Sequence, residues 1–258
     1  GTQAVGRSGG RLPMTIVGAA NPVPVRYTTP MPSAQVKSAV LLAGFGAAGV
    51  GKGVVRCKDT PNFIGNRLLS GTNAFALDYI LENHYTVPEI DAITGPAIGR
   101  PKTATFRLVD LVGIDVLRHV TQNLIPAIPH DEHALCYLKS EKVNRLMSAM
   151  VDKGWLGNKT RVGFYKQVRT EGKKEFWPLD LETLEHVPPT KPRFDSVGET
   201  RKAETLAEKM KIFMNADDRA AQFIQAITLQ TFTYVSEMIP QIADTPKPID
   251  DTMLCVFN

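Results

Sequence analysis

The chain has 258 residues, of which 43% are hydrophobic and 22% are charged. Such a chain holds one large domain or two small ones and has enough apolar residues to bury a core, which excludes an intrinsically disordered protein. The formal charge of +4 comes from 30 basic and 26 acidic residues scattered along the sequence, which argues against a nucleic-acid partner and favours anionic small molecules.

The cysteines and the hydropathy indicate the cellular compartment of the protein. Cys57, Cys136 and Cys255 are odd in number, lack the spacing of metal ligands and follow no secretory signal. We therefore expect free thiols in a reducing compartment, and no metal site. The longest uncharged stretch, residues 220–236, is too short and too rich in Gln and Thr to span a bilayer. The expected location is the cytoplasm, without a membrane partner.

The first thirty residues predict short strands and turns. Two β-branched segments, 15–17 and 23–27, are interrupted by prolines, which suits edge strands and excludes helices. Ser33 then precedes a short predicted helix over residues 36–43. Free amide groups at its start, with Ser33, Gln35 and Lys37 nearby, would suit a phosphate or another anion. A plain N-cap at Ser33 is the alternative.

A glycine-rich segment follows, and it resembles two nucleotide-binding motifs. Residues 44–49 fit the dinucleotide pattern G-x-G-x-x-G, and residues 46–53 approach a phosphate-binding P-loop. Both motifs need a helix directly behind the glycines, and here Gly53, two valines and Pro61 follow instead. Gly53 also stands where a P-loop needs Ser or Thr. We interpret the segment as a flexible Gly/Ala connector.

From about Pro61 the sequence predicts helices, with strands confined mainly to the first thirty residues. Thr60 is the predicted N-cap of a helix that has Pro61 at its first position and extends to Asn83. Thr86 and Glu89 form a capping box for a second helix. Residues 172–198 are rich in proline and charge and predict a surface excursion. Further predicted helices span residues 106–124, 139–153, 203–215 and 218–239.

Two other features concern repeats and polar side chains. Residues 89–91 are echoed by residues 248–250, which indicates a repeated helical unit cut short in its second copy; a chance match is the alternative.

The five histidines form no metal-binding pattern, and His130 and His133 are expected to be solvated in a loop. Asn66 is a polar amide in the first turn of an apolar helix, where it either satisfies the helix start or points into a pocket.

Several motifs beyond residue 50 share one similarity. They are Lys58-Asp59-Thr60-Pro61-Asn62-Phe63-Ile64-Gly65-Asn66-Arg67-Leu68-Leu69, Gly99-Arg100-Pro101, Leu108-Val109-Asp110-Leu111-Val112-Gly113, Lys153-Gly154-Trp155-Leu156-Gly157-Asn158-Lys159 and Gly163-Phe164-Tyr165. Residues 51–258 thereby resemble the C-terminal helical region of NAD-dependent 3-hydroxyacyl-CoA dehydrogenases of fatty-acid β-oxidation. The resemblance implies a mainly α fold, a helical domain like the C-terminal domain of 6-phosphogluconate dehydrogenase, with the start of a second repeat and a short β-containing N-terminal segment.

Residues 1–44 resemble a different family. The motifs are Gly9-Gly10-Arg11-Leu12-Pro13-Met14-Thr15-Ile16 and Pro32-Ser33-Ala34-Gln35-Val36-Lys37. They are similar to an internal stretch of 5-enolpyruvylshikimate-3-phosphate synthase, which implies that Ser33 and Gln35 contact shikimate 3-phosphate. The two resemblances together predict three parts: residues 1–50 as a synthase-like fragment with its connector, 51–170 as the dehydrogenase helical domain, and 171–258 as a linker with a truncated second repeat.

The dehydrogenase resemblance implies that Asn66 is a catalytic residue, whose amide donates a hydrogen bond to the substrate's oxygen. The family's NAD-binding domain and its catalytic histidine and glutamate have no counterpart in these residues, so we expect no cofactor to bind this chain and no turnover by it alone. An acyl-CoA substrate and a homodimer or a partner dehydrogenase subunit are the implied partners. Two alternatives are a non-enzymatic interaction module and a synthase fragment.

Overall fold

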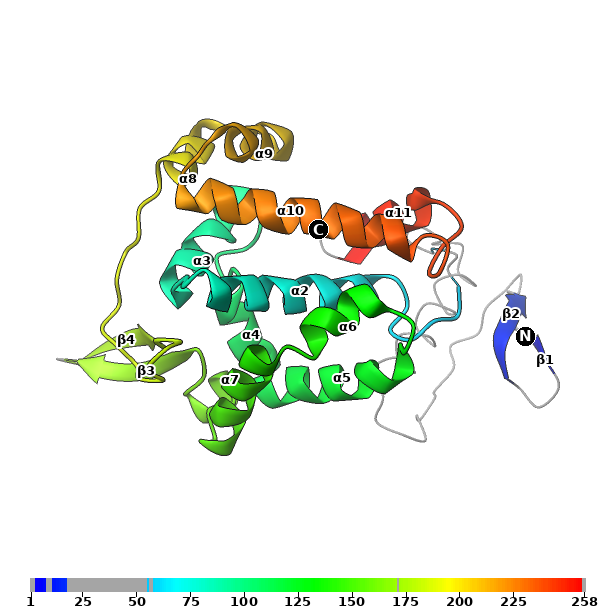
Figure 1. Ribbon diagram of the computed structural model, residues 1–258, viewed down its shortest axis with the longest axis horizontal. Helices are drawn as coiled ribbons and strands as arrows, with labels where there is room; N and C mark the ends of the chain where they lie inside the picture. The colour runs from blue at the N-terminus through cyan, green and yellow to red at the C-terminus, as the bar shows by residue number, and fades with distance from the viewer. Residues whose placement is uncertain (1–2, 8–10, 18–54, 56–57, 171, 257–258) are drawn as a thin grey trace. The chain divides into compact units, whose positions relative to one another are not determined.

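The computed structural model describes residues 3–7, 11–17, 55, 58–170 and 172–256. Within these ranges the protein is mainly helical, as predicted (Figure 1). The chain divides into two compact units: the first is residues 1–65 with 239–258, and the second is residues 66–238. None of the helices in the described ranges combines the length and apolar character that crossing a bilayer requires. The predicted helix over 36–43, the segment 23–27 and both glycine motifs lie outside the described residues.

The first unit contains a β-hairpin and the last helix. Strands β1 (Gln3–Arg7) and β2 (Arg11–Val17) pair antiparallel, in agreement with the β-rich texture of this region. Helix α11 spans Pro246–Val256. Ahead of α11, Lys58 donates from its ammonium group to the carbonyl of Pro240 over 2.6 Å and pairs with Asp244 at 2.8 Å. Its backbone N–H donates to Ile242, so residue 58 is fixed to the segment before α11.

The second unit is built from helices and one hairpin. Helix α2 spans Gly65–Glu82, and α10 (Arg219–Met238) lies beside it (Figure 1). Gly71 permits this approach, because a Cβ there would lie 2.5 Å from the ring of Tyr234. The remaining elements are α3 (Val87–Ile93), η1 (Pro96–Ile98), α4 (Phe106–Val112), α5 (Ile114–Ala127), α6 (Glu132–Leu138), α7 (Glu141–Asp152), η2 (Asn158–Thr160), β3 (Tyr165–Thr170), β4 (Lys173–Pro178), α8 (Asp195–Glu199), η3 (Thr200–Lys202) and α9 (Leu206–Asn215).

Local capping explains where several helices begin. The predicted capping box of α3 is confirmed: the Thr86 hydroxyl accepts from the Glu89 N–H, and the Glu89 carboxylate accepts from the Thr86 N–H at 2.8 Å. Thr205 and Glu208 form the same motif at α9. Apolar side chains behind these caps, among them Ile90, Phe106 and Phe213, are almost fully buried and form the core.

Four predictions about residues beyond α2 were wrong. Residues 106–124 form two helices, because Gly113 adopts φ 104 and interrupts the helical path. Strands are not confined to the first thirty residues, since β3 and β4 pair antiparallel over residues 165–178. Residues 172–198 are not wholly a surface excursion, because Leu179 is only 1% exposed. His133 lies on helix α6 and not in a solvated loop, and its side chain is 18% exposed.

Candidate functional site

The candidate site begins where α2 begins. The predicted start at Thr60 and Pro61 was wrong, because Asn62 and Phe63 have φ of 64 and 52, which no right-handed helix admits. Helix α2 starts at Gly65 instead. Asn66 therefore lies in the first turn of α2, as the sequence predicted.

Asn66 is exposed to solvent. Its backbone carbonyl accepts a hydrogen bond from the Ser70 hydroxyl at 2.7 Å. Its side-chain amide has no hydrogen-bond partner within the described part of the chain. The alternative that Asn66 caps its own helix is therefore not supported by a hydrogen bond among these residues. The amide group is chemically equipped to donate to a carbonyl or hydroxyl oxygen of a ligand.

Replacing Asn66 by alanine should therefore leave the free energy of unfolding nearly unchanged, whereas loss of a true cap would cost about 1 kcal/mol. Urea unfolding of the native chain and the variant, followed by circular dichroism, measures this difference. A loss near the cap value would show that Asn66 serves its own helix.

A buried polar cluster lies directly beside Asn66 in the sequence. Arg67, 4% exposed, donates from Nε and from a terminal nitrogen to Asp131 at 3.0 and 2.7 Å. The Tyr234 hydroxyl donates to the same carboxylate oxygen at 2.7 Å, and its burial raises the pKa of the phenol. Asp131 also accepts from the Ala134 N–H, as the N-cap of α6. One carboxylate thus connects α2, α6 and α10.

His133 extends this cluster towards the surface. Its Nδ1 lies 2.6 Å from the Glu237 carboxylate, its Nε2 contacts the Gln230 amide, and its ring is 5.1 Å from that of Tyr234. Sequence reasoning missed the cluster. The available signal was Arg67 itself, a cation on an apolar helix, since a buried charge requires a partner.

Two further carboxylates, the buried Asp110 and the half-buried Asp91, organise α4 and the β3–β4 hairpin. Asp91 accepts from the N–H groups of Thr105 and Phe106 at 3.1 and 2.7 Å and from the Tyr165 hydroxyl at 2.8 Å. Asp110 accepts from the N–H groups of Phe164 and Tyr165 at 2.8 and 2.9 Å. Burial raises the pKa of both carboxyls, that of Asp110 to about 6. All but one of these bonds come from backbone N–H groups, so the two carboxylates hold loops in place.

The buried Asp110 makes stability depend on pH. Its pKa rises from an ordinary value of 3.8 to about 6 on folding, so the folded chain holds the proton more tightly. The contribution of Asp110 to the free energy of unfolding is full below about pH 4 and falls by about 3 kcal/mol as the pH rises through about 6. Urea unfolding measures the free energy of unfolding of the native chain and of Asp110→Asn. The value for the native chain minus the value for the variant should become smaller as the pH rises through about 6. A difference independent of pH would contradict it.

The described residues contain neither a cluster of metal-binding side chains nor the succession of elements that forms a Rossmann-type NAD site. They contain no group of three or more His, Cys, Asp or Glu side chains placed to hold a metal ion. Both sheets in the described ranges are antiparallel hairpins, and NAD sites of the Rossmann type need a strand, a glycine loop and a helix in succession. The described residues therefore do not fit NAD. Ser33 and Gln35 lie outside the described residues.

Comparison with known proteins identifies the helical part. Residues 63–167 match the family model for 3-hydroxyacyl-CoA dehydrogenase, C-terminal domain. The chain is 39% identical over 217 residues to a "Probable 3-hydroxyacyl-CoA dehydrogenase" of Bacillus subtilis, which covers 84% of this chain and 26% of that protein. A protein of the same name from Deinococcus radiodurans is 36% identical over 122 residues, 47% of this chain and 33% of the relative.

A second group of relatives has another function. The 3-phosphoshikimate 1-carboxyvinyltransferase of Dinoroseobacter shibae is 80% identical over 49 residues, which is 19% of this chain and 11% of that enzyme. The chain spans about a quarter of the Bacillus protein and about a tenth of this one. The chain is therefore homologous to 3-hydroxyacyl-CoA dehydrogenases, with residues 63–167 matching their C-terminal domain, and it matches 5-enolpyruvylshikimate-3-phosphate synthases in part.

Proposed function

We propose that the chain is the helical, substrate-binding and dimerisation portion of a 3-hydroxyacyl-CoA dehydrogenase of fatty-acid β-oxidation, with a fold like the C-terminal domain of 6-phosphogluconate dehydrogenase. The match of residues 63–167 to the dehydrogenase C-terminal domain carries this proposal. The start of a second repeat is supported by the parallel between α2–α3 and α10–α11, in which Thr86 and Thr245 directly precede α3 and α11. The exposed free thiol of Cys136 suits a cytoplasmic location.

Asn66 is the proposed catalytic residue. Its exposed amide donates a hydrogen bond to the oxygen of an acyl-CoA substrate, and donors of this kind stabilise negative charge that develops on such an oxygen. The reaction also needs a group that takes up a proton and an acceptor for hydride. The described residues do not fit NAD, so we propose that this chain alone binds and orients substrate without oxidising it.

Calorimetric titration of the full chain with acetoacetyl-CoA tests the proposal. The native chain should bind, and Asn66→Ala should bind about tenfold more weakly, the effect of one lost hydrogen bond in a desolvated contact. Asn73→Ala is the matched control, because it removes an exposed amide from the same helix. Equal affinities in native chain and Asn66→Ala would overturn the role of Asn66.

A second candidate function is a non-enzymatic interaction module, and one observation favours it. Helices α4 and α5 expose five apolar side chains that are between 38% and 56% accessible, namely Leu108, Leu111, Val112, Val116 and Val120. Large apolar side chains exposed on two successive helices suit a protein contact. Measuring the solution mass of the native chain and of Leu111→Glu, together with acyl-CoA binding by the same samples, separates the candidates. A dimer that the variant dissociates and that binds no acyl-CoA would favour the interaction module.

A further inference from the structure

The β3–β4 hairpin carries two cations on one face, and a third comes from α4. The register places Arg169 directly opposite Lys174 and Gln167 directly opposite Phe176. Side chains alternate between the faces of a strand, so Arg169, Lys174 and Phe176 share a face. Arg107 of α4 reaches the same place, with its guanidinium carbon 3.9 Å from the centre of the Phe176 ring. We call Arg107, Arg169 and Lys174 the hairpin cation face.

Two of the three charges lie near the same aromatic ring, that of Phe176. Arg107 also lies 5.3 Å from the Tyr165 ring, and the Lys174 ammonium lies 5.0 Å from the Phe176 ring. Attraction to the aromatic rings holds Arg107 and Lys174 in position. Arg169 and Lys174 are nevertheless like charges directly opposite each other on a two-stranded sheet, an arrangement that disfavours pairing of the strands.

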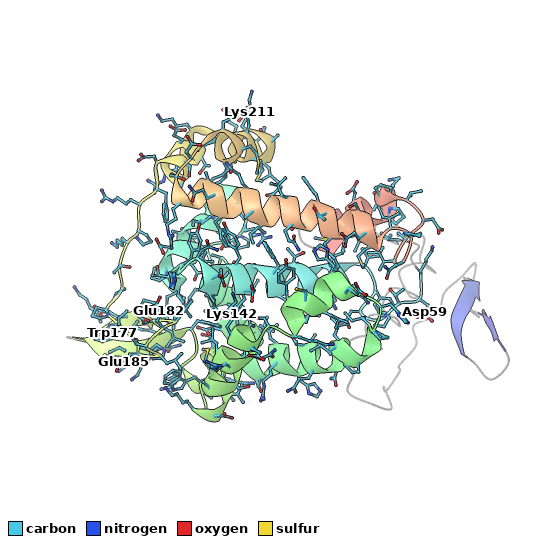
Figure 2. The ribbon with its side chains drawn as sticks, in the orientation of Figure 1. Asp59, Lys142, Trp177, Glu182, Glu185 and Lys211 are labelled. Carbon is cyan, nitrogen blue, oxygen red and sulfur yellow. The ribbon has the colours of Figure 1, made fainter. Side chains whose placement is uncertain are left out.

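No carboxylate in the described ranges forms an ion pair with the hairpin cation face. Of the nearby acids, Asp110 is buried and Asp91 is half-buried, and both accept hydrogen bonds from backbone N–H groups. Because side chains alternate along each strand, Glu175 lies on the opposite face of the hairpin, together with Lys166, Lys173 and Trp177 (Figure 2). The positive field of the face is therefore directed outwards, with Arg169 and Lys174 exposed.

We propose that the hairpin cation face binds a phosphate or pyrophosphate group, of the kind carried at the nucleotide end of an acyl-CoA. A guanidinium fork and an ammonium group are the donors that phosphate oxygens prefer, and bonds between charged partners are the strongest of their class. Arg107, half-buried and stacked on Phe176, supplies a fixed donor, while Arg169 and Lys174 close on the anion. The choice of acyl-CoA rests on the proposed function, whereas the anion site does not.

The test is an NMR titration of the full chain with inorganic pyrophosphate, CoA and dephospho-CoA at low ionic strength. Pyrophosphate and CoA should shift the amide signals of Arg107 and of the hairpin strands. The double variant Arg169→Gln/Lys174→Gln should lose about tenfold or more in affinity for pyrophosphate, the effect of losing charge-assisted hydrogen bonds. Lys166→Gln/Lys173→Gln is the matched control, because it removes the same number of charges from the opposite face of the same hairpin.

Two results would overturn the site: no shift with pyrophosphate, or equal losses in the two double variants, which would mark a general effect of charge. Binding of pyrophosphate without binding of CoA would overturn the acyl-CoA assignment. Weaker binding of dephospho-CoA than of CoA would support contact with the 3′-phosphate. Asn66→Ala should leave pyrophosphate affinity unchanged, so failure of the catalytic proposal and failure of the anion site are distinguishable.

Discussion

Replacing Asp131 by alanine should lower the free energy of unfolding by about 3–5 kcal/mol, because removal of one partner leaves an uncompensated buried charge. Arg67 is 4% exposed and pairs with Asp131 through two nitrogens. The Tyr234 hydroxyl and the Ala134 N–H lose the same acceptor. Equilibrium unfolding in urea measures the effect.

Two further variants keep this prediction testable. Asp115→Ala is the control, because Asp115 pairs with Lys159 at the surface, where water screens the charges, and its loss should be much smaller. Should Asp131→Ala fail to fold, the double variant Arg67→Met/Asp131→Leu should recover stability, since it removes both buried charges together. Equal losses in Asp131→Ala and Asp115→Ala would contradict the account of the cluster.

Replacing Gly157 by alanine should cost about 4 kcal/mol, which combines backbone strain of about 1–3 with overpacking of about 1–3 kcal/mol. Gly157 has φ 96 and ψ −147, a conformation open essentially to glycine alone. A Cβ at this position would lie 2.4 Å from the backbone oxygen of Asp110 and 2.9 Å from its Cα. The turn before β3 would have to move away from α4.

Gly154→Ala isolates the strain, because Gly154 has φ 71 and a Cβ there would meet no atom within 4 Å. It should cost about 1–2 kcal/mol. Thermal unfolding of both variants compares them directly. Similar losses would show that the close approach between Gly157 and Asp110 does not limit stability.

The sequence predicts helices best where the information is local. Thr86 and Glu89 are three residues apart, so their capping box could be read directly, and the prediction is confirmed. Gly113 interrupts a helix only because its φ is 104, and a glycine inside an apolar run does not reveal this conformation in advance. The start of α6 was missed because Asp131 is both its N-cap and the partner of Arg67, a pairing that exists only in the folded chain.

In the candidate site, too, only the features that depend on neighbouring residues could be predicted from the sequence. The place of Asn66 in the first turn of α2 follows from neighbouring residues and was predicted. Arg67 and Asp131 are 64 residues apart, and Tyr234 is 103 residues beyond Asp131, so no short pattern joins them. The hairpin cation face likewise depends on strand register, which brings Arg169 opposite Lys174 and sets Arg107 of α4 against both strands.

The central claim is that this chain binds acyl-CoA through its helical portion but does not oxidise it alone. The most direct measurement follows the absorbance of reduced NAD after the full chain is mixed with NAD and a 3-hydroxyacyl-CoA. The account predicts no formation of reduced NAD above the rate without protein. Sustained formation that Asn66→Ala abolishes and Asn73→Ala retains would contradict it, because the chain itself would then supply both the proton acceptor and the cofactor site.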